Sequence, residues 1–525
     1  MTVMKKASLY ILFVIAAVVI TSCHDFSEIG PNNNRPSSVP PATVLRGVLK
    51  DVVEQPWSLE HRQNQFWSCN YDYYGNNKYW TSASFDSYLT LKNVVKMEEE
   101  AAVTGDEINP YSALGKFIRA ILFVRLTQRV GDVPMDQAVQ GVAVQQPVYN
   151  TQKEVYVQVL EWLDQANDDF KYLIENADDI APTTGNTLQG DFFYSGDLAK
   201  WRKAVNTFKL RVLVSLSKKT SDTELDVINR FAEVVNNPAE FPVMTGNEDN
   251  MNYVYNGSTE LYPINPGNRG FDKGRYNMTE TYVKGLTDLN DPRAFVTLNP
   301  AEEKIADGVS PTDFAAYVGA PAGESQDDMT VKAGNGVYSF ANQKRYYTSF
   351  TGPEPAVQLG YWELCFTIAE AINRGWVTGN AATYYANGIK SSMAFYGISD
   401  GTILSITEPD NDEVIATVTV SVTDYLAQSE VVYQGNNAAG LAQILTQKYL
   451  AFFQNSGQEA YFNYRRTGVP AFHAGPGTGN SNVIPVRWLY PSSESFYNSA
   501  NLSTALTAQF GSQVDDVDNQ LWINE

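Results

Sequence analysis

The chain has 525 residues, of which 43% are hydrophobic, so it can bury a large core. It carries 38 basic and 59 acidic residues, a net charge of −21, and we expect no nucleic-acid partner because phosphate binding needs a basic surface. Its three histidines have no companions at metal-ligand spacing, so we expect no metal site and no cofactor. The 31 tyrosines favour surfaces that stack on a ligand and hydrogen-bond to it.

The N-terminal segment has the pattern of a secretory leader. After two lysines, an apolar run covers residues 9–20, which is shorter than the about 20 residues that a membrane-spanning helix needs. The next residues, up to Cys23, resemble the lipobox of bacterial lipoproteins, and an ordinary cleavable signal with a chance cysteine is the alternative. We predict a signal peptide over residues 1–22, lipidation of Cys23, and a flexible tether rich in Pro, Asn and Ser over residues 23–43.

Residues 65–80 read QFWSCNYDYYGNNKYW, and seven of these sixteen residues are aromatic. Trp67, Tyr71 and Tyr74 have the spacing of one helix face, which favours packing in the core. Gly75 would end that helix, and a loop after it could stack on a flat ligand, with simple packing of the loop as the alternative. The ligand-binding residues that we predict in this segment are Tyr73, Asn76, Asn77, Tyr79 and Trp80.

Amphipathic helices are predicted along much of the remaining chain. In residues 114–130 apolar side chains recur at helical spacing, Gly131 supplies a C-terminal stop, and Pro134 prevents continuation. Thr151 and Glu154 form a capping box at the start of the next helix. Such helix pairs with short turns are typical of helical repeats, although their spacing is irregular. Further helices are expected in residues 197–217, 221–235 (with a capping box from Ser221 to Glu224), 359–375, 380–397 and 441–453.

A long segment, residues 237–351, is rich in Gly, Pro, Asn and Tyr and mostly lacks a helical period. A segment of this kind within a domain is usually functional rather than a mere connection. The further ligand contacts that we predict in it are Tyr262, Arg275 and Tyr276, and the alternative is that its arginines pair with the abundant carboxylates of the chain.

Two shorter features are predicted to be structural. Asp291-Pro292-Arg293 forms a turn that returns the arginine to an internal carboxylate. Residues 402–423 alternate apolar and polar side chains around a PDND turn, which indicates a β-hairpin.

Several blocks of the sequence resemble one known family. LGKFIRAILFVRLTQRVGDVPM (residues 114–135) resembles the hallmark segment of the SusD/RagB family, in which a helix with Arg and aromatic residues ends in a Gly-Asp-Val/Ile-Pro turn. Residues 190–211 resemble the family's block with Tyr-Gly-Asp and Lys-Leu-Arg, with Ser195 in place of Gly. The likeness is closest to the second major subgroup of the family. Residues 147–166, 359–377 and 447–470 add further likenesses in the family's order.

The resemblance implies a mainly α fold, in which tetratricopeptide-like helical hairpins pack against an irregular, loop-rich lobe with a small β-hairpin, as a single domain over residues 44–525. It also implies an outer-membrane lipoprotein of Bacteroidetes, anchored at the cell surface through fatty acids such as palmitate on Cys23. Such proteins capture oligosaccharides, or in some cases peptides, and deliver them to a SusC-like TonB-dependent transporter without catalysis.

Two other functions remain as alternatives to this one. A helical glycoside hydrolase would need only two suitably spaced carboxylates, although no common catalytic motif occurs in the sequence. A helical-repeat adaptor that binds protein segments would need only the helical hairpins.

Overall fold

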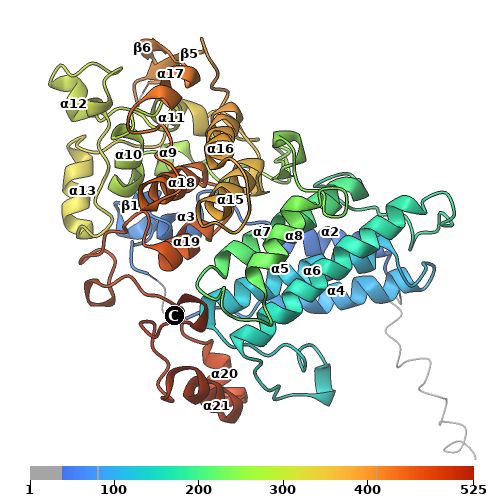
Figure 1. Cartoon of the computed structure of the whole chain (residues 1–525). Helices are drawn as coiled ribbons and strands as arrows, with labels where there is room; N and C mark the ends of the chain where they lie inside the picture. The colour runs from blue at the N-terminus through green and yellow to red at the C-terminus, as the bar shows by residue number, and fades with distance from the viewer. Residues whose placement is uncertain (1–37, 80–81, 410) are drawn as a thin grey trace, which may run out of the picture. The chain divides into compact units, whose positions relative to one another are not determined.

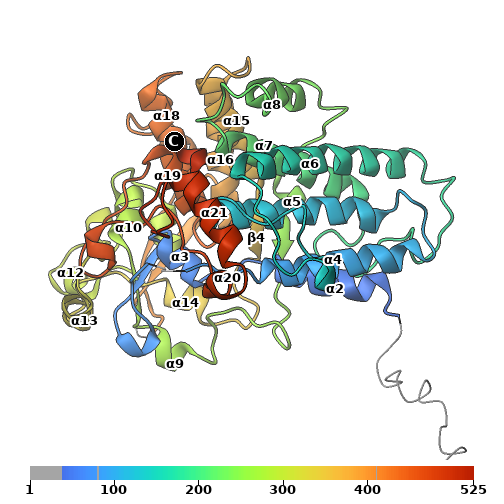
Figure 2. The same ribbon diagram turned by 90° about the horizontal axis from the view of Figure 1, so that it is seen from below.

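Most of the longer helices that the sequence predicts are present. In the computed structural model, residues 38–79, 82–409 and 411–525 are described, and Pro41–Glu525 form one unit. The predicted signal peptide, Cys23 and Trp80 lie outside the described residues. Long helices lie side by side in one part of this unit (Figures 1 and 2). They are α2 (Pro41–Asp51), α4 (Ser87–Ala102), α5 (Pro110–Val130), α6 (Gln152–Glu175) and α7 (Leu198–Ser215).

Local signals determine where these helices begin and end. Asn109 caps α5 by accepting hydrogen bonds from the next backbone N–H groups, and the helix ends at Gly131, whose φ of 98° suits glycine. The predicted capping box of Thr151 and Glu154 is present at the start of α6. Both boundaries are therefore confirmed.

A second group of helices surrounds the later part of the chain. The predicted hairpin of α15 (Tyr361–Asn373) and α16 (Ala381–Phe395) is confirmed, and α18 (Ala438–Ala451) packs against both helices. The capping box from Ser221 to Glu224 is wrong, because α8 (Val227–Asn236) begins later. Asp222 instead accepts hydrogen bonds from the backbone N–H groups of Glu224 and Leu225, which makes a turn before the helix.

Short elements build the remaining lobe. The sequence of residues 237–351 indicates a long irregular segment. In the structure, this segment contains several short helices and strands. The short helices of the unit are α3 (Leu59–Gln63), α9 (Arg269–Asp272), α10 (Glu280–Thr287), α11 (Arg293–Thr297), α12 (Glu302–Ala306), α13 (Gln326–Gly334), α14 (Gln343–Tyr346), α17 (Val422–Ala427), α19 (Glu459–Thr467), α20 (Ser492–Tyr497) and α21 (Ser499–Phe510). Single 3-10 turns are η2 (Asp72–Tyr74), η3 (Gly141–Ala143), η4 (Asn247–Asp249), η5 (Phe314–Ala316), η6 (Asn480–Asn482) and η7 (Trp522–Asn524).

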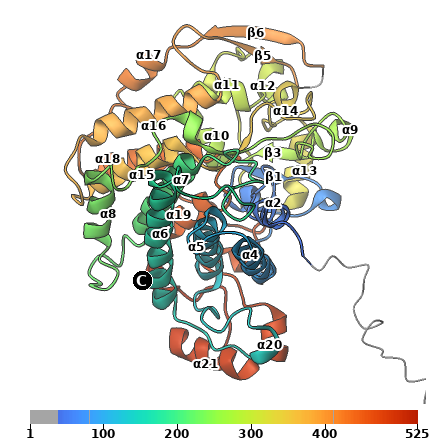
Figure 3. The same ribbon diagram turned by 90° about the vertical axis from the view of Figure 1, so that its right-hand side faces the viewer.

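The strands of the described residues form three antiparallel pairs. They are β1 (Trp67–Cys69) with β3 (Tyr276–Met278), β2 (Met251–Tyr253) with β4 (Ala356–Leu359), and β5 (Ile403–Thr407) with β6 (Val414–Thr419). The last pair confirms the predicted hairpin. Figure 3 shows it at one edge of the unit, with α20 and α21 at the opposite edge. The expected fold class, helical hairpins beside a loop-rich lobe, is thus confirmed.

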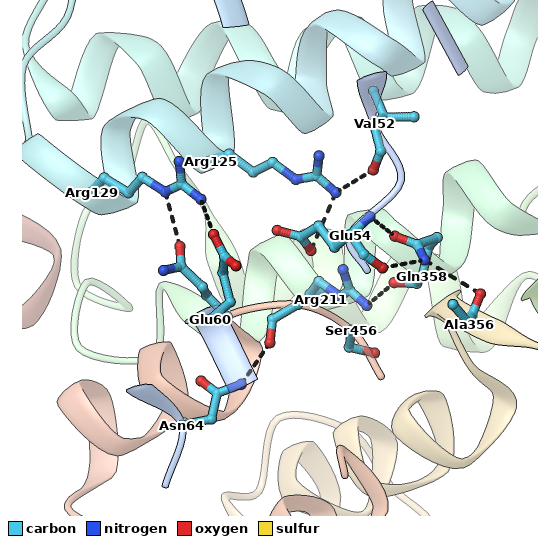
Figure 4. A network of polar contacts seen from close by, with 12 residues as sticks. Val52, Glu54, Glu60, Asn64, Arg125, Arg129, Arg211, Ala356, Gln358 and Ser456 are labelled. Atoms are coloured by element: carbon cyan, nitrogen blue, oxygen red, sulfur yellow. Dashed lines mark hydrogen bonds and ion pairs between the residues drawn. The ribbon is translucent and has the colours of Figure 1, made fainter. Parts of the chain in front are cut away.

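Arginines of the long helices hold the segment that leads to the aromatic stretch (Figure 4). Arg125 of α5 lies 3.3 Å from the Glu54 carboxylate and donates a hydrogen bond of 2.9 Å to the Val52 carbonyl. Arg211 of α7 pairs with Glu363 of α15 at 2.5 Å, and it donates to the backbone carbonyl of Gln358 at 2.9 Å. These contacts fix residues 52–54 between the helices and the lobe.

Among the described residues, no helix combines the length and the apolar character that a membrane crossing requires.

Candidate ligand-binding surface

The aromatic stretch forms a strand and a tight turn instead of the predicted helix. Trp67 lies in β1 and is buried, with 4% of its surface exposed, whereas Tyr71 is 45% exposed. The predicted helix face of Trp67, Tyr71 and Tyr74 is therefore wrong. The strand forms because β1 pairs with β3, from a distant part of the chain, and such tertiary pairing overrides a local pattern. A signal for the strand was present in the aromatic residues before Asn70.

Asn70 joins the two segments that carry the surface. Its backbone N–H donates to the carbonyl of Arg275 at 3.0 Å, and its side-chain amide donates to the carbonyl of Gly274 at 3.0 Å. From α13, Gln326 donates a hydrogen bond of 2.8 Å to the Gly75 carbonyl. The turn after β1 is therefore held from both sides, and its tyrosines are presented by an ordered backbone.

Four tyrosines and an arginine form the outer part of this region, where two of the tyrosines are exposed and the other residues are half-buried. Tyr73 is 84% exposed, and its ring meets the edge of the Tyr74 ring at a centroid distance of 5.2 Å. The Arg275 guanidinium carbon lies 4.9 Å from the centroid of the Tyr71 ring and 5.9 Å from that of Tyr74. Tyr276, which is half-buried, packs on Trp67 at 4.6 Å. We define the tyrosine surface as Tyr71, Tyr73, Tyr74, Arg275 and Tyr276.

Three of the predicted ligand-binding residues lie in the interior. Asn77 is 7% exposed and bonds through its side-chain amide to both backbone groups of Cys69 at 2.8 Å. The buried Tyr79 donates its hydroxyl hydrogen to the Gln63 carbonyl at 2.8 Å. Tyr262 is 2% exposed and accepts a hydrogen bond of 3.0 Å from the indole N–H of Trp57. These hydrogen bonds support the fold. We therefore correct the prediction that these three side chains lie on an exposed surface, because they lie in the interior.

The other predicted residues fall into two groups. Tyr73, Arg275 and Tyr276 belong to the tyrosine surface, and Asn76 is exposed beside it. The side-chain oxygen of Asn76 accepts a hydrogen bond of 3.0 Å from the backbone N–H of Lys78, which stabilises the turn. Trp80 lies outside the described residues. Sequence reasoning missed Tyr71 as a surface residue because it assigned it to the core, whereas Tyr74 is half-buried and does pack against the core.

The tyrosine surface carries phenol hydroxyls and one guanidinium group. Burial raises the pKa of Tyr276 to about 12, so its hydroxyl stays protonated. Burial also raises the pKa of Asp272, which lies under the surface, to about 6, and a hydrogen bond with Tyr347 opposes that rise. The surface therefore offers aromatic faces, hydroxyl groups and a guanidinium, which suit stacking and hydrogen bonding rather than acid–base chemistry.

No metal centre is apparent in the part of the chain that the structure describes, where no group of three or more His, Cys, Asp or Glu side chains could hold an ion. Cys69 and Cys365 are both buried as free thiols. Burial raises the pKa of Cys365 to about 12, so this thiol is protonated at neutral pH and is a poor nucleophile.

A separate groove has a volume of about 470 Å³ and lies where α2 and α3 meet α4 and α5. Its two arginines face carboxylates of the same groove, Arg125 with Glu54 at 3.3 Å and Arg129 with Glu60 at 4.0 Å. Since these charges already compensate each other, the groove presents fewer free binding groups than the tyrosine surface.

Comparison with known proteins agrees with this fold. A family described as "Starch-binding associating with outer membrane" matches residues 33–491. The crystal structure of a SusD homologue from Bacteroides fragilis is 31% identical, with a TM-score of 0.79 over 93% of this chain and 100% of that one. A second SusD homologue from Bacteroides fragilis is 28% identical, with a TM-score of 0.76 and the same coverage.

A chitin-binding SusD homologue from Flavobacterium johnsoniae shares the fold at 20% identity, with a TM-score of 0.65 over 92% of this chain and 98% of that one. No curated protein matches the chain. The family match covers most of the sequence, and it agrees with the resemblance that the Gly-Asp-Val-Pro turn and the other blocks indicate. This chain therefore belongs to the SusD-like family.

Proposed function

We propose that this protein is a cell-surface lipoprotein that captures oligosaccharides and delivers them to a SusC-like TonB-dependent transporter. The observation that carries the proposal is the tyrosine surface, in a chain whose family is described as starch-binding and associated with the outer membrane. The chitin-binding relative from Flavobacterium johnsoniae supports a glycan as the ligand class.

The chemistry of the surface supports sugar binding. Sugars have flat apolar C–H faces that stack on aromatic rings, and hydroxyl rims that hydrogen-bond to polar side chains. Tyr73 is 84% exposed, which leaves most of its ring in water until a ligand covers it. Asn76 and Arg275 lie next to the rings and supply amide and guanidinium donors for the hydroxyls.

The anchor belongs to the same proposal. Lipidation at Cys23, followed by the tether, would hold the folded unit at the outer membrane and leave the tyrosine surface free to meet ligands. The protein then binds its ligand without changing it, and the transporter removes it.

A binding screen with a product analysis tests this function. The purified protein, without its lipid, is applied to an array of malto-, chito- and acidic oligosaccharides and of peptides. We expect binding to oligosaccharides and, after incubation, recovery of each oligosaccharide at its original length by chromatography. Shortened products would show an enzyme, and binding to peptides alone would assign the protein to peptide capture.

A further inference from the structure

Two arginines in the described part of the chain lack carboxylate partners: Arg275, which belongs to the tyrosine surface, and Arg62, which lies next to it. Among the described residues, neither Arg62 nor Arg275 makes an ion pair or a side-chain hydrogen bond, although the chain has an excess of acidic residues. Elsewhere in the same unit arginines pair directly, as Arg119 does with Glu98 and Arg466 does with Glu370. Arg202 and Arg465 also lack a carboxylate partner within the described ranges, but they donate hydrogen bonds to other oxygens, and Arg46 is exposed to water. Arg62 and Arg275, which are half-buried, have neither kind of partner among the described residues.

Each of the two guanidinium groups lies against the aromatic residues. Arg275 lies over the Tyr71 and Tyr74 rings, at 4.9 Å and 5.9 Å. Arg62 lies 5.3 Å from the centroid of the Trp67 ring, and its Nε is buried without a hydrogen-bond partner among the described residues. Because the guanidinium of Arg62 comes within 2.9 Å of where a Cβ would stand on Gly75, the turn passes directly over it.

The positive charges of Arg62 and Arg275 both act on the thiol of Cys69. The thiol of Cys69 lies between the two segments. Burial raises its pKa, and the hydrogen bond to the Tyr71 carbonyl and then the nearby charges of Arg62 and Arg275 oppose that rise. A partly desolvated guanidinium without an anion is electrostatically unfavourable, so two of them together create a positive potential that an incoming anion would relieve.

The nearby carboxylates do not cancel this potential. Asp272 is 5% exposed and, with a pKa that burial raises to about 6, keeps most of its charge at neutral pH, but its carboxylate hydrogen-bonds to Tyr347 and pairs with neither arginine among the described residues. Glu60 lies near enough to act on the charge of Arg62, but it also faces Arg129 at 4.0 Å, so its single charge serves two arginines. Asp72, on the turn, is exposed and forms no ion pair among the described residues, so water screens it.

We propose, resting on the proposed function, that the tyrosine surface prefers oligosaccharides that carry an anionic group, a carboxylate or a sulfate ester. Arg275, already oriented by the rings of Tyr71 and Tyr74, binds the anionic group while the rings stack on the sugar faces. Arg62 adds a second positive charge from below and strengthens the attraction.

Matched probes test the preference by calorimetry on the whole folded protein. Oligogalacturonates are compared with the same oligosaccharides after full methyl esterification, and sulfated galactan oligosaccharides with their desulfated forms. We expect at least one anionic probe to bind about tenfold more tightly than its neutral form at low salt, with a smaller difference at high salt. Which anionic probe binds distinguishes a carboxylate from a sulfate.

Variants assign the effect to Arg275. Arg275→Gln should reduce the affinity for the anionic probe to that for the neutral form, and Arg275→Lys should retain part of the preference. Arg46→Gln, at an exposed arginine of α2, is the matched control and should leave all affinities unchanged.

Equal affinity for anionic and neutral probes in the wild type would overturn this inference, and so would an equal loss for both in Arg275→Gln. If neutral and anionic oligosaccharides bind equally well and Tyr73→Ala weakens both, the proposed function stands while the preference fails. If no oligosaccharide binds, or only acidic peptides do, both proposals fail.

Discussion

At the scale of single residues, Arg293 is the clearest example of a charge that holds the loop-rich lobe. Arg293 and Asp291 are both fully buried and pair at 2.6 Å. Tyr425 donates a hydrogen bond of 2.7 Å to the same carboxylate, and Gln447 accepts one of 2.7 Å from Arg293. A buried pair of this kind contributes less than its attraction suggests, but the loss of one partner leaves an uncompensated charge.

We therefore expect Arg293→Met to lower the free energy of unfolding by about 3–5 kcal/mol, because Asp291 would stay buried without its cation. Chemical denaturation followed by circular dichroism measures the change. Glu240→Ala is the control, since the ion pair of Glu240 with Lys171 lies at the surface, where water screens it, and its loss should change the stability far less. Similar effects of the two substitutions would contradict this view.

Whether the sequence predicts the contacts of a single side chain depends on how far along the chain its partner lies. The sequence was enough to predict that Arg293 returns to a carboxylate, because Asp291 is two residues away. It was not enough for Asn77, Tyr79 or Tyr262, whose partners are backbone groups or side chains that only the tertiary fold brings near. An aromatic or amide side chain in a loop-like sequence therefore cannot be placed inside or outside from its type alone.

At the scale of elements, the turn after α5 joins three helices. Asp132 donates its backbone N–H to the side-chain oxygen of Gln509 in α21 at 2.9 Å, and its carboxylate accepts the backbone N–H of Gln152 in α6 at 2.8 Å. Tyr490 also donates its hydroxyl hydrogen to the Asp132 carbonyl at 2.7 Å. The sequence predicted the turn itself, from Gly131 and Pro134, but not these partners, of which Gln509 and Tyr490 come from the C-terminal part of the chain.

Gly131→Ala should be strongly destabilising. Gly131 has φ of 98°, and an added Cβ would stand 2.1 Å from the Gln509 side-chain oxygen, so the substitution adds backbone strain and displaces a hydrogen-bond partner. We expect a loss of about 2–4 kcal/mol in the free energy of unfolding. Gly375→Ala, with φ of 76° and no atom within 4 Å of the added Cβ, should cost only about 1–2 kcal/mol. Equal losses of free energy of unfolding in the two variants would show that the contact with Gln509 does not contribute to the effect.

Asp132 should make stability depend on pH. Burial raises its pKa from 3.8 to about 7, so the folded protein holds this proton more tightly than the unfolded chain does. Its stabilising contribution is complete below pH 3.8 and is lost as the pH rises through about 7.

Asp132→Asn cannot ionise and keeps an oxygen for the backbone N–H of Gln152. We therefore expect its stability relative to the wild type to increase by about 1–3 kcal/mol between about pH 5 and pH 8. Urea denaturation at the two pH values measures this difference, in which the other titrating groups cancel. A difference that is independent of pH would contradict the assignment.

At the scale of the whole molecule, the fold was more predictable than the site. Helical periodicity, caps and glycine stops marked α5, α6, α7, α15 and α16, and the family blocks placed them in a known architecture. The tyrosine surface was only partly predictable, because it forms where β1 pairs with β3 and brings Tyr71 beside Arg275. The spacing of residues along a single segment carries no information on such a pairing.

The lipid anchor gives a prediction for the protein in the cell. Replacement of the modified residue in Cys23→Ala should release the protein from membranes, since the tether has no other means of attachment in the proposal. Fractionation of cells that lack the partner transporter, with immunoblotting of membrane and soluble fractions, measures this. Retention of the variant in the membrane fraction would contradict the lipoprotein assignment.

The central claim, that the tyrosine surface captures oligosaccharides, is tested most directly by calorimetric titration of a Tyr71→Ala/Tyr73→Ala double variant. The titrant is the oligosaccharide that binds the wild type best, and Tyr172→Ala, at a tyrosine of α6 that is 46% exposed, is the control. We predict that the double variant binds at least about tenfold more weakly, since each stacked ring contributes about 0.5–1.5 kcal/mol beyond its buried area. The control should bind like the wild type. Equal affinity of the double variant and the wild type would contradict the account.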